Sequence, residues 1–141
     1  MEKENKNVRF AFIKINTDQF AIIDGVFKNQ PNVEFKFGLQ FGANRDTELL
    51  SVKVLIQYAV VDKDFLIFEA SCVFKIDSDD WKTLLTDNEI VVPKSIMTHL
   101  AVLTIGTARG IFHSKTEGTN YNGFIIPTIN VTEIILEDVR L

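Results

Sequence analysis

Cys72, His99 and His113 are the side chains that could act as a nucleophile, a general base or a metal ligand. Cys72 lies in an alternating apolar segment, where a free cysteine behaves as a small hydrophobic residue, and no neighbour along the chain would lower its pKa. The two histidines are 14 residues apart, a spacing that fits no common zinc motif. We expect His99 at an edge or interface and His113 in a solvated loop.

The acidic run Asp77, Asp79 and Asp80 offers the oxygen ligands that calcium prefers. Trp81, however, stands at the fifth position of such a loop, and the sixth position lacks the glycine that a calcium loop needs. We therefore interpret the run as the N-terminal cap of a short helix that contains Trp81 and Leu84.

Motifs for catalysis or cofactor binding are otherwise missing from the sequence. The glycines form neither a phosphate loop nor a dinucleotide fingerprint, and no pair of carboxylates lies on a recognisable scaffold for acid–base chemistry. Asn130-Val131-Thr132 matches a glycosylation sequon, but we interpret it as a helix cap. We expect a protein that binds rather than catalyses, with no metal and no cofactor.

Composition narrows the class of protein further. The 141 residues suit one domain with a genuine core, and a hydrophobic fraction of 46% excludes a disordered chain. A charged fraction of 24%, with no run of roughly 20 apolar residues, argues against a membrane protein. The net charge of −4, with scattered Lys and Arg, argues against nucleic acid as a partner. A single cysteine and an N-terminus unlike a signal peptide favour the cytoplasm.

Alternation of apolar and polar residues predicts β-strands over residues 33–41, 50–60 and 66–76. The connections between these three segments are too short for parallel crossovers, so the strands should be antiparallel neighbours. One face of the resulting sheet is apolar and needs a cover. An earlier strand carries Val8, Phe10 and Phe12. We expect a polar tail over residues 1–7 and one domain over residues 8–141.

The cover is a long helix from Pro93 to Gly110, since proline favours a first turn and glycine follows a last turn. Turned at about 100° per residue, the helix shows no charged face between Ile96 and Ala108, apart from any charge on His99. A helix on the sheet of a monomer should show water a charged face, so we expect this one to be buried by its own sheet and by a second subunit. The expected interface residues are Met97, Ala101, Val102, Thr104, Ile105 and Ala108.

The last part of the chain has a polar loop over residues 113–123 and an apolar stretch over residues 124–127. Asn130 and Glu133 then have the spacing of a capping box, which predicts a short helix. The predicted fold class is α+β: a four-stranded antiparallel sheet covered on one face by a long helix, plus a short C-terminal helix.

Three stretches carry a resemblance to a known family. Residues 26–36 look like a crossover into a second strand, Pro93 opens a helix that closes with Ala108-Arg109-Gly110, and residues 126–131 place Pro127 shortly before Asn130 and Val131. In these features the chain resembles the SecB family of export chaperones over about residues 10–135, and its Ile126-Pro127-Thr128-Ile129-Asn130-Val131 is similar to the Pro-x-Asn-hydrophobic stretch that leads into the family's final helix. The resemblance implies a cytoplasmic dimer of dimers, assembled through the long helix and a sheet edge, that holds non-native polypeptides in surface grooves without ATP.

The expected groove lies between the crossover and the loop after the long helix. Apolar residues in these loop-like stretches fall outside the alternating core pattern, and exposed apolar residues mark interaction sites. The residues expected to line the groove are Phe27, Pro31, Phe124, Ile125 and Ile126.

The expected partners are unfolded or nascent polypeptides. The family docks on an export motor ATPase through an acidic sheet face, whereas the outward strand positions here mix Lys36 and Lys53 with Glu34 and Glu69. Some SecB-like proteins instead serve toxin–antitoxin systems, so an export role and a toxin–antitoxin role both stay open.

Three other functions fit parts of the pattern. A small hydrophobic ligand could bind in a cavity between sheet and helix, and a purely structural subunit would bind no unfolded chain. A thioesterase-like enzyme would also wrap strands around a long helix, but its helix normally precedes most strands, and here no acid–base residue is placed on the helix.

Overall fold

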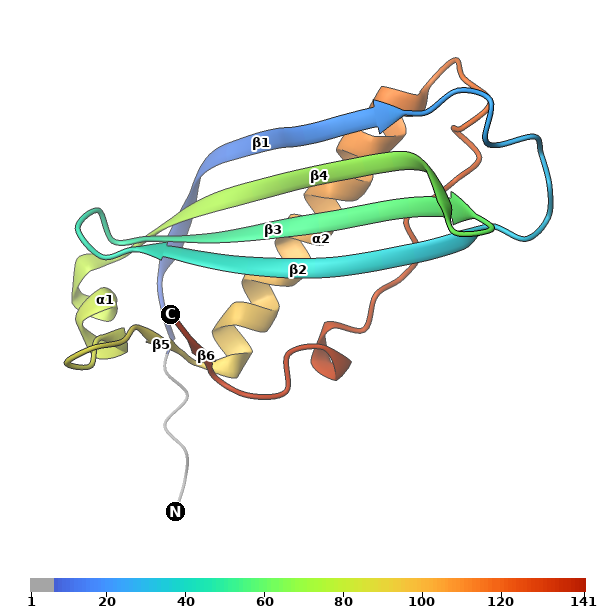
Figure 1. The fold of residues 1–141 in the computed structure, drawn as a ribbon. Helices are drawn as coiled ribbons and strands as arrows, with labels where there is room; N and C mark the ends of the chain where they lie inside the picture. Colours follow the sequence, from blue (N-terminus) through green and yellow to red (C-terminus); the bar gives the residue numbers. More distant parts are fainter. Residues whose placement is uncertain (1–6) are drawn as a thin grey trace.

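A four-stranded antiparallel sheet forms the centre of the computed structural model, which describes residues 7–141 (Figure 1). The strands follow the order β1-β4-β3-β2, so the first strand pairs with the last one rather than with the second. The predicted tail over residues 1–7 lies outside the described residues except for Asn7. The strands are β1 (Phe10–Ile22), β2 (Glu34–Asn44), β3 (Leu49–Val60) and β4 (Lys63–Ile76).

The two central strands carry the core, as their alternation predicts. On β3 the side chains of Leu50, Val52 and Val54 are 0% exposed, and on β4 the same holds for Phe68 and Phe74. These residues share one face of the sheet, because Val52 pairs with Cys72 and Leu50 with Phe74 across the ladder. The edge strands β1 and β2 are only half-buried on the same face.

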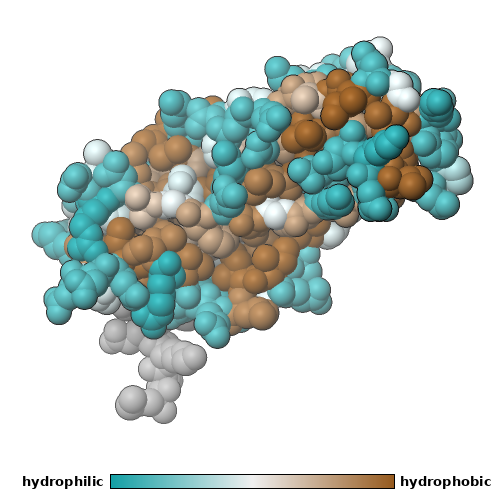
Figure 2. Space-filling view, viewed as in Figure 1, coloured by the Kyte–Doolittle hydropathy of each residue, from teal (hydrophilic) through white to brown (hydrophobic). Residues whose placement is uncertain are grey.

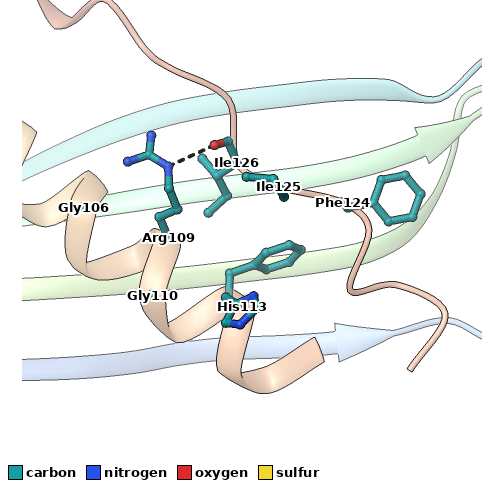
Figure 3. Close-up of a pocket in the computed structure, with 8 residues that line it drawn as sticks. Gly106, Arg109, Gly110, His113, Phe124, Ile125 and Ile126 are labelled. Atoms are coloured by element: carbon teal, nitrogen blue, oxygen red, sulfur yellow. Dashed lines mark hydrogen bonds between the residues drawn. The ribbon is translucent and has the colours of Figure 1, made fainter. Parts of the chain in front are cut away.

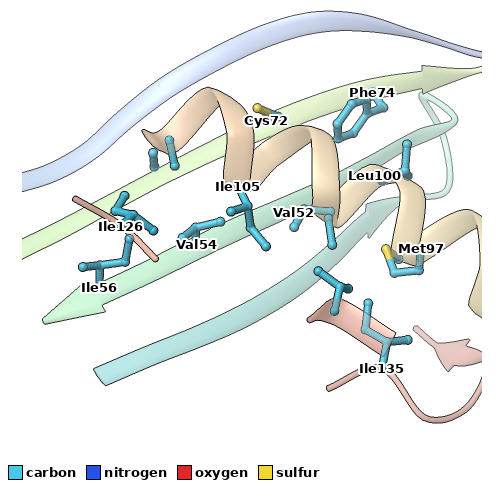
Figure 4. Close-up of a cluster of buried hydrophobic side chains, with 14 of the residues drawn as sticks. Val52, Val54, Ile56, Cys72, Phe74, Met97, Leu100, Ile105, Ile126 and Ile135 are labelled. Atoms are coloured by element: carbon cyan, nitrogen blue, oxygen red, sulfur yellow. The ribbon is translucent and has the colours of Figure 1, made fainter. Parts of the chain in front are cut away.

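Helix α2 (Lys94–Thr116) covers that face and crosses the strands diagonally (Figures 1 and 4). Eight of its residues are buried, among them Leu100, Ala101 and Phe112. By length and mean hydropathy (1.2 in the most apolar window) α2 could also cross a membrane, but its place on the sheet is that of a core helix.

The predicted end of this helix at Gly110 is wrong, because α2 continues to Thr116. A glycine inside a helix costs only about 1 kcal/mol relative to alanine. Burial of Phe112 (1% exposed) and Thr116 (0% exposed) in the following two turns outweighs that cost. Part of the predicted loop over residues 113–123 is therefore helical.

The predicted short C-terminal helix is also wrong in extent. Asn130 does act as a cap, since its Oδ1 accepts a hydrogen bond from the Thr132 N–H at 3.2 Å, but only one 3-10 turn, η1 (Val131–Glu133), follows. The chain then extends to pair strand β6 (Val139–Arg140) with β5 (Val91–Val92). This pairing keeps the segment extended and prevents the helix from continuing.

The short helix α1 (Ser78–Leu84) forms as predicted, with the Asp77 side chain accepting from the Asp79 N–H. Arg9 joins the start of β1 to this helix through hydrogen bonds to Asp80 at 2.9 and 3.0 Å and an ion pair with Asp77 at 3.0 Å. The acidic run therefore stabilises a helix start, in line with its interpretation as a cap rather than a calcium loop.

Candidate functional site

Aromatic rings from separate segments meet at one end of the sheet. Phe27 of the crossover stacks on Phe65 of β4 with ring centroids 5.0 Å apart, and it meets Phe124 edge-on at 5.1 Å. Tyr58 of β3 lies 5.0 Å from Phe124, and burial raises the pKa of its phenol to about 12. The structure thus brings together Phe27 and Phe124, which the sequence analysis assigned to one groove.

A pocket of about 350 Å³ opens beside this aromatic cluster, between the second half of α2 and the segment that returns along it (Figure 3). We call it the α2 pocket. Its wall is mostly apolar, and Ile125 stands at its mouth with 70% of its surface exposed. The lining residues are Gly106, Arg109, Gly110, Phe112, His113, Phe124, Ile125 and Ile126.

The five predicted groove residues divide among three environments. Phe124 and Ile125 line the α2 pocket, and Phe27 supports it through its contact with Phe124. Ile126 lines the pocket floor but is 1% exposed and packs in the core, as Figure 4 shows. Pro31 is exposed in the crossover and is not part of the pocket lining.

Two exposed glycines of α2, Gly106 and Gly110, face the pocket and were missed as site residues by the sequence analysis. A Cβ at either position would meet no heavy atom of the subunit within 4 Å, and neither residue has a positive φ. Neither close packing within the subunit nor backbone conformation therefore requires glycine. Each one costs the helix about 1 kcal/mol relative to alanine, and each one widens the pocket.

Arg109 fixes the segment that returns along α2 and forms the other wall of the pocket. Its Nε donates to the Ile126 carbonyl at 3.0 Å (Figure 3), and its Nη2 donates to the Pro127 carbonyl, also at 3.0 Å. The sequence analysis placed Arg109 at a helix end, whereas it lies two turns inside α2 and fixes the returning segment. His113 lies nearby and is exposed, with its Nε2 3.3 Å from Glu117 Oε1.

The predicted interface residues of α2 mostly face inward. Met97, Ala101, Thr104 and Ala108 are 0% exposed and Ile105 is 4% exposed, because the small strip of the helix packs on the subunit's own sheet. A second subunit could not touch these five side chains in this arrangement. Val102, 52% exposed, is the predicted interface residue that remains accessible.

The outward side of α2 is still uncharged in its middle. Between Ser95 and Gly110, its exposed residues are, in order, Ser95, His99, Val102, Gly106 and Gly110. His99 contacts the ring of Phe10 on β1, with centroids 5.6 Å apart, which agrees with its predicted place at an edge.

Hydrophobic side chains also reach the surface along β1. Phe12, Ile13 and Ile15 are 43%, 53% and 54% exposed, and the outer edge of this strand has no partner strand among residues 7–141. Figure 2 shows that the face seen in Figure 1 carries hydrophobic patches between hydrophilic ones. An exposed sheet edge with apolar residues is a site for association with another chain.

The described part of the chain brings no catalytic constellation together. Cys72 is buried, and burial raises the pKa of its thiol, although hydrogen bonds from Thr104 and Thr107 act in the opposite direction. Within residues 7–141, no three His, Cys, Asp or Glu side chains are grouped so that they could hold a metal ion. The arrangement is suited to non-covalent binding of apolar groups.

No family model and no curated protein matches this chain by sequence. A SecB-like chaperone from Mycobacterium tuberculosis, solved in complex with a ChAD peptide from the HigA1 antitoxin, matches in structure with a TM-score of 0.54. It is 11% identical, over 86% of this chain and 91% of that one. A protein of unknown function from Streptococcus agalactiae matches with a TM-score of 0.40 and 11% identity, over 89% and 99% of the two chains.

Proposed function

From a SecB-like fold, which the match to the mycobacterial chaperone establishes, we propose that the chain is an ATP-independent holdase. It binds extended apolar segments of non-native polypeptides in the α2 pocket and along the adjoining crossover. The observation that carries this proposal is an aromatic-lined pocket whose two helical glycines have no role inside the subunit.

The apolar pocket wall provides the binding energy. Burial of one client side chain of Phe or Leu size is worth about 1.5–3 kcal/mol. A few such burials, less the cost of ordering the client, give about −8 kcal/mol, which corresponds to micromolar affinity. Generic apolar contacts of this kind discriminate little between sequences, as a holdase requires.

Assembly is the second part of the proposal. The outward side of the first half of α2, with Ser95, His99 and Val102, and the free edge of β1 provide the long helix and the sheet edge of a homo-oligomer, a dimer of dimers. Val102 on the helix and Phe12, Ile13 and Ile15 on the strand are apolar residues that a second subunit would bury. A client chain could then pass from the pocket of one subunit to that of the next.

The proposed holdase has two candidate cellular roles. The mycobacterial neighbour was solved with a peptide from an antitoxin, which supports polypeptide clients and favours a toxin–antitoxin role here. Delivery to an export motor remains the other candidate role. The two roles can be distinguished by purifying the chain and asking which partner comes with it. A toxin–antitoxin pair encoded beside its gene would support the first role, and the motor ATPase would support the second.

A small hydrophobic ligand is the second candidate occupant. A pocket of about 350 Å³ falls in the range of roughly 300–1,000 Å³ for small-molecule sites. The pocket lies outside the sheet–helix interior, however, and not in the cavity that the sequence analysis considered. Native mass spectrometry would show one bound small molecule per subunit for a ligand carrier and a bound peptide for a holdase.

The decisive test is the double substitution Gly106→Ala, Gly110→Ala. Each new methyl group meets no atom of the subunit, so the variant should gain up to about 1 kcal/mol of folding stability per site. Both methyl groups protrude into the pocket, so suppression of client aggregation should fall severalfold. Stability and activity are thus expected to move in opposite directions.

Ser114→Ala is the matched control, since Ser114 is an exposed residue of α2 that does not line the pocket. It should raise stability slightly and leave client protection unchanged. Undiminished protection by the double glycine variant would show that clients bind elsewhere.

A further inference from the structure

The lining of the α2 pocket contains a positive charge and no negative one. Arg109 is a lining residue, and no carboxylate contributes to the wall. Glu117, which lies 3.3 Å from His113, is 65% exposed at its side chain and stands outside the lining.

Arg109 differs in its partners from two other arginines of the chain, which form ion pairs with carboxylates. Arg9 pairs with Asp77 and Asp80 at 3.0 Å, and Arg140 pairs with Glu89 at 2.8 Å. Arg109 is more buried than either, yet within residues 7–141 it forms no ion pair, and it donates hydrogen bonds to the carbonyls of Ile126 and Pro127.

Carbonyl groups accept hydrogen bonds from a guanidinium but do not neutralise it. Two carbonyls also leave some of the N–H donors of Arg109 unused, since a guanidinium has a fork of donors that suits a carboxylate. The Nε of Arg109 is part-buried and its Nη2 reaches the exposed rim of the apolar pocket, where a carboxylate could approach it.

We propose that the α2 pocket selects client segments in which an acidic side chain stands next to a large apolar one. The apolar side chain lies between Gly106, Gly110 and Phe124, and the carboxylate accepts hydrogen bonds from the free N–H groups of Arg109. This inference rests on the proposed holdase function and adds to it a preference for one chemical class of client.

The net charge of −4 does not oppose this preference at the pocket. Charges more than about 8 Å apart are largely screened at physiological ionic strength. The positive charge of Arg109 therefore dominates the electrostatic energy of a carboxylate bound beside it, and the remote acidic residues contribute little.

The test compares three fluorescent peptides with the same apolar core, Phe-Leu-Phe, flanked by Asp, Asn or Lys. Fluorescence anisotropy with the full chain should show the Asp peptide binding about tenfold more tightly than the Asn peptide, and the Lys peptide most weakly. Added salt should reduce the difference, because the contact is electrostatic.

Two variants locate the effect. Arg109→Gln keeps a donor for one carbonyl but removes the charge, so the Asp and Asn peptides should bind equally. Lys115→Gln removes a charge from an exposed α2 residue outside the pocket lining and should leave the preference unchanged. Equal loss of preference in both variants would overturn the assignment to Arg109.

The wild-type measurements stand even where Arg109→Gln fails to fold. Equal binding of the three peptides, or tightest binding of the Lys peptide, would overturn the acidic preference and leave the holdase function intact. Absence of binding for all three would instead count against the holdase function itself.

Discussion

Small residues line both sides of helix α2, but they have opposite roles. On the inward side, Ala101, Thr104 and Ala108 are fully buried and let the helix approach its sheet closely. On the outward side, a Cβ added at Gly106 or Gly110 would meet no heavy atom within 4 Å. One side of this helix therefore builds the core while the other leaves room for a partner, at a small cost in helix stability.

The largest effect is expected on the inward side. Leu100→Ala removes a side chain that is 0% exposed, and the resulting cavity should lower the free energy of unfolding by about 2–5 kcal/mol. Ser114→Ala, at an exposed position of the same helix, should change it by less than about 0.5 kcal/mol. Urea unfolding of both variants measures the contrast, and equal losses would show that the Ser114 side chain is also packed in the subunit.

The next effect concerns binding rather than folding. Ile125→Asp changes a residue that is 70% exposed at the pocket mouth, so stability should stay within about 0.5 kcal/mol of the wild type. Affinity for an apolar client should fall about tenfold or more, because one buried client contact is worth about 1.5–3 kcal/mol. Isothermal titration calorimetry measures this loss.

Ile134→Asp is the control for that change, because Ile134 is 45% exposed and does not line the pocket. Its client affinity should equal that of the wild type. A comparable loss in both variants would mean that any added negative charge weakens binding.

A smaller effect is expected at the start of α2. Pro93 provides no side-chain cap, and Asp138 Oδ1 instead accepts a hydrogen bond from the Lys94 N–H at 2.8 Å. Asp138→Ala should lower the free energy of unfolding by about 1 kcal/mol, the usual worth of such a cap, without affecting the pocket at the far end of the helix. Glu137→Ala, a neighbouring exposed carboxylate, should be neutral.

The smallest expected effect is a loss of folding stability at acidic pH. Backbone and side-chain hydrogen bonds from Arg9 hold the pKa of Asp80 below its ordinary value of 3.8, and hydrogen bonds from Lys75 and Ser78 hold that of Glu48 below 4.5. A pKa lowered by folding stabilises the protein above the unfolded-state value, and the gain is lost as the pH falls through the folded-state value.

The urea midpoint should therefore decrease modestly below about pH 4. Arg9→Gln should flatten the part of this decrease that Asp80 contributes. A decrease of unchanged size in Arg9→Gln would assign the acid sensitivity to other carboxylates.

The sequence predicted the central sheet well because β3 and β4 have uninterrupted alternation. It underestimated β1, whose inward residues change phase twice: Phe10 and Phe12 are followed by Ile15 and then by Phe20, with register shifts after Phe12 and after Thr17. Each bulge returns the following apolar residues to the inward face of the sheet. It also interrupts the strict alternation by which a strand is recognised in a sequence.

The candidate site was predictable in part. Phe124 and Ile125 stood out as apolar residues in a loop-like stretch, and both line the pocket. Gly110 did not, because a glycine after an Arg near a predicted helix end resembles a stop signal, and Gly106 did not, because it lies inside the predicted helix. The inward orientation of the small strip was equally hidden, since an uncharged helix does not reveal which side meets the sheet.

The central claim is that clients bind in the α2 pocket. Methyl NMR of the isotope-labelled wild-type chain, titrated with an apolar client peptide, tests it directly. We expect intermolecular NOEs from client aromatic protons to the Ile125 methyl group, with none to Ile76 in the core. NOEs confined to Ile13 and Ile15 on β1, with the Ile125 signal unmoved at saturation, would contradict the claim.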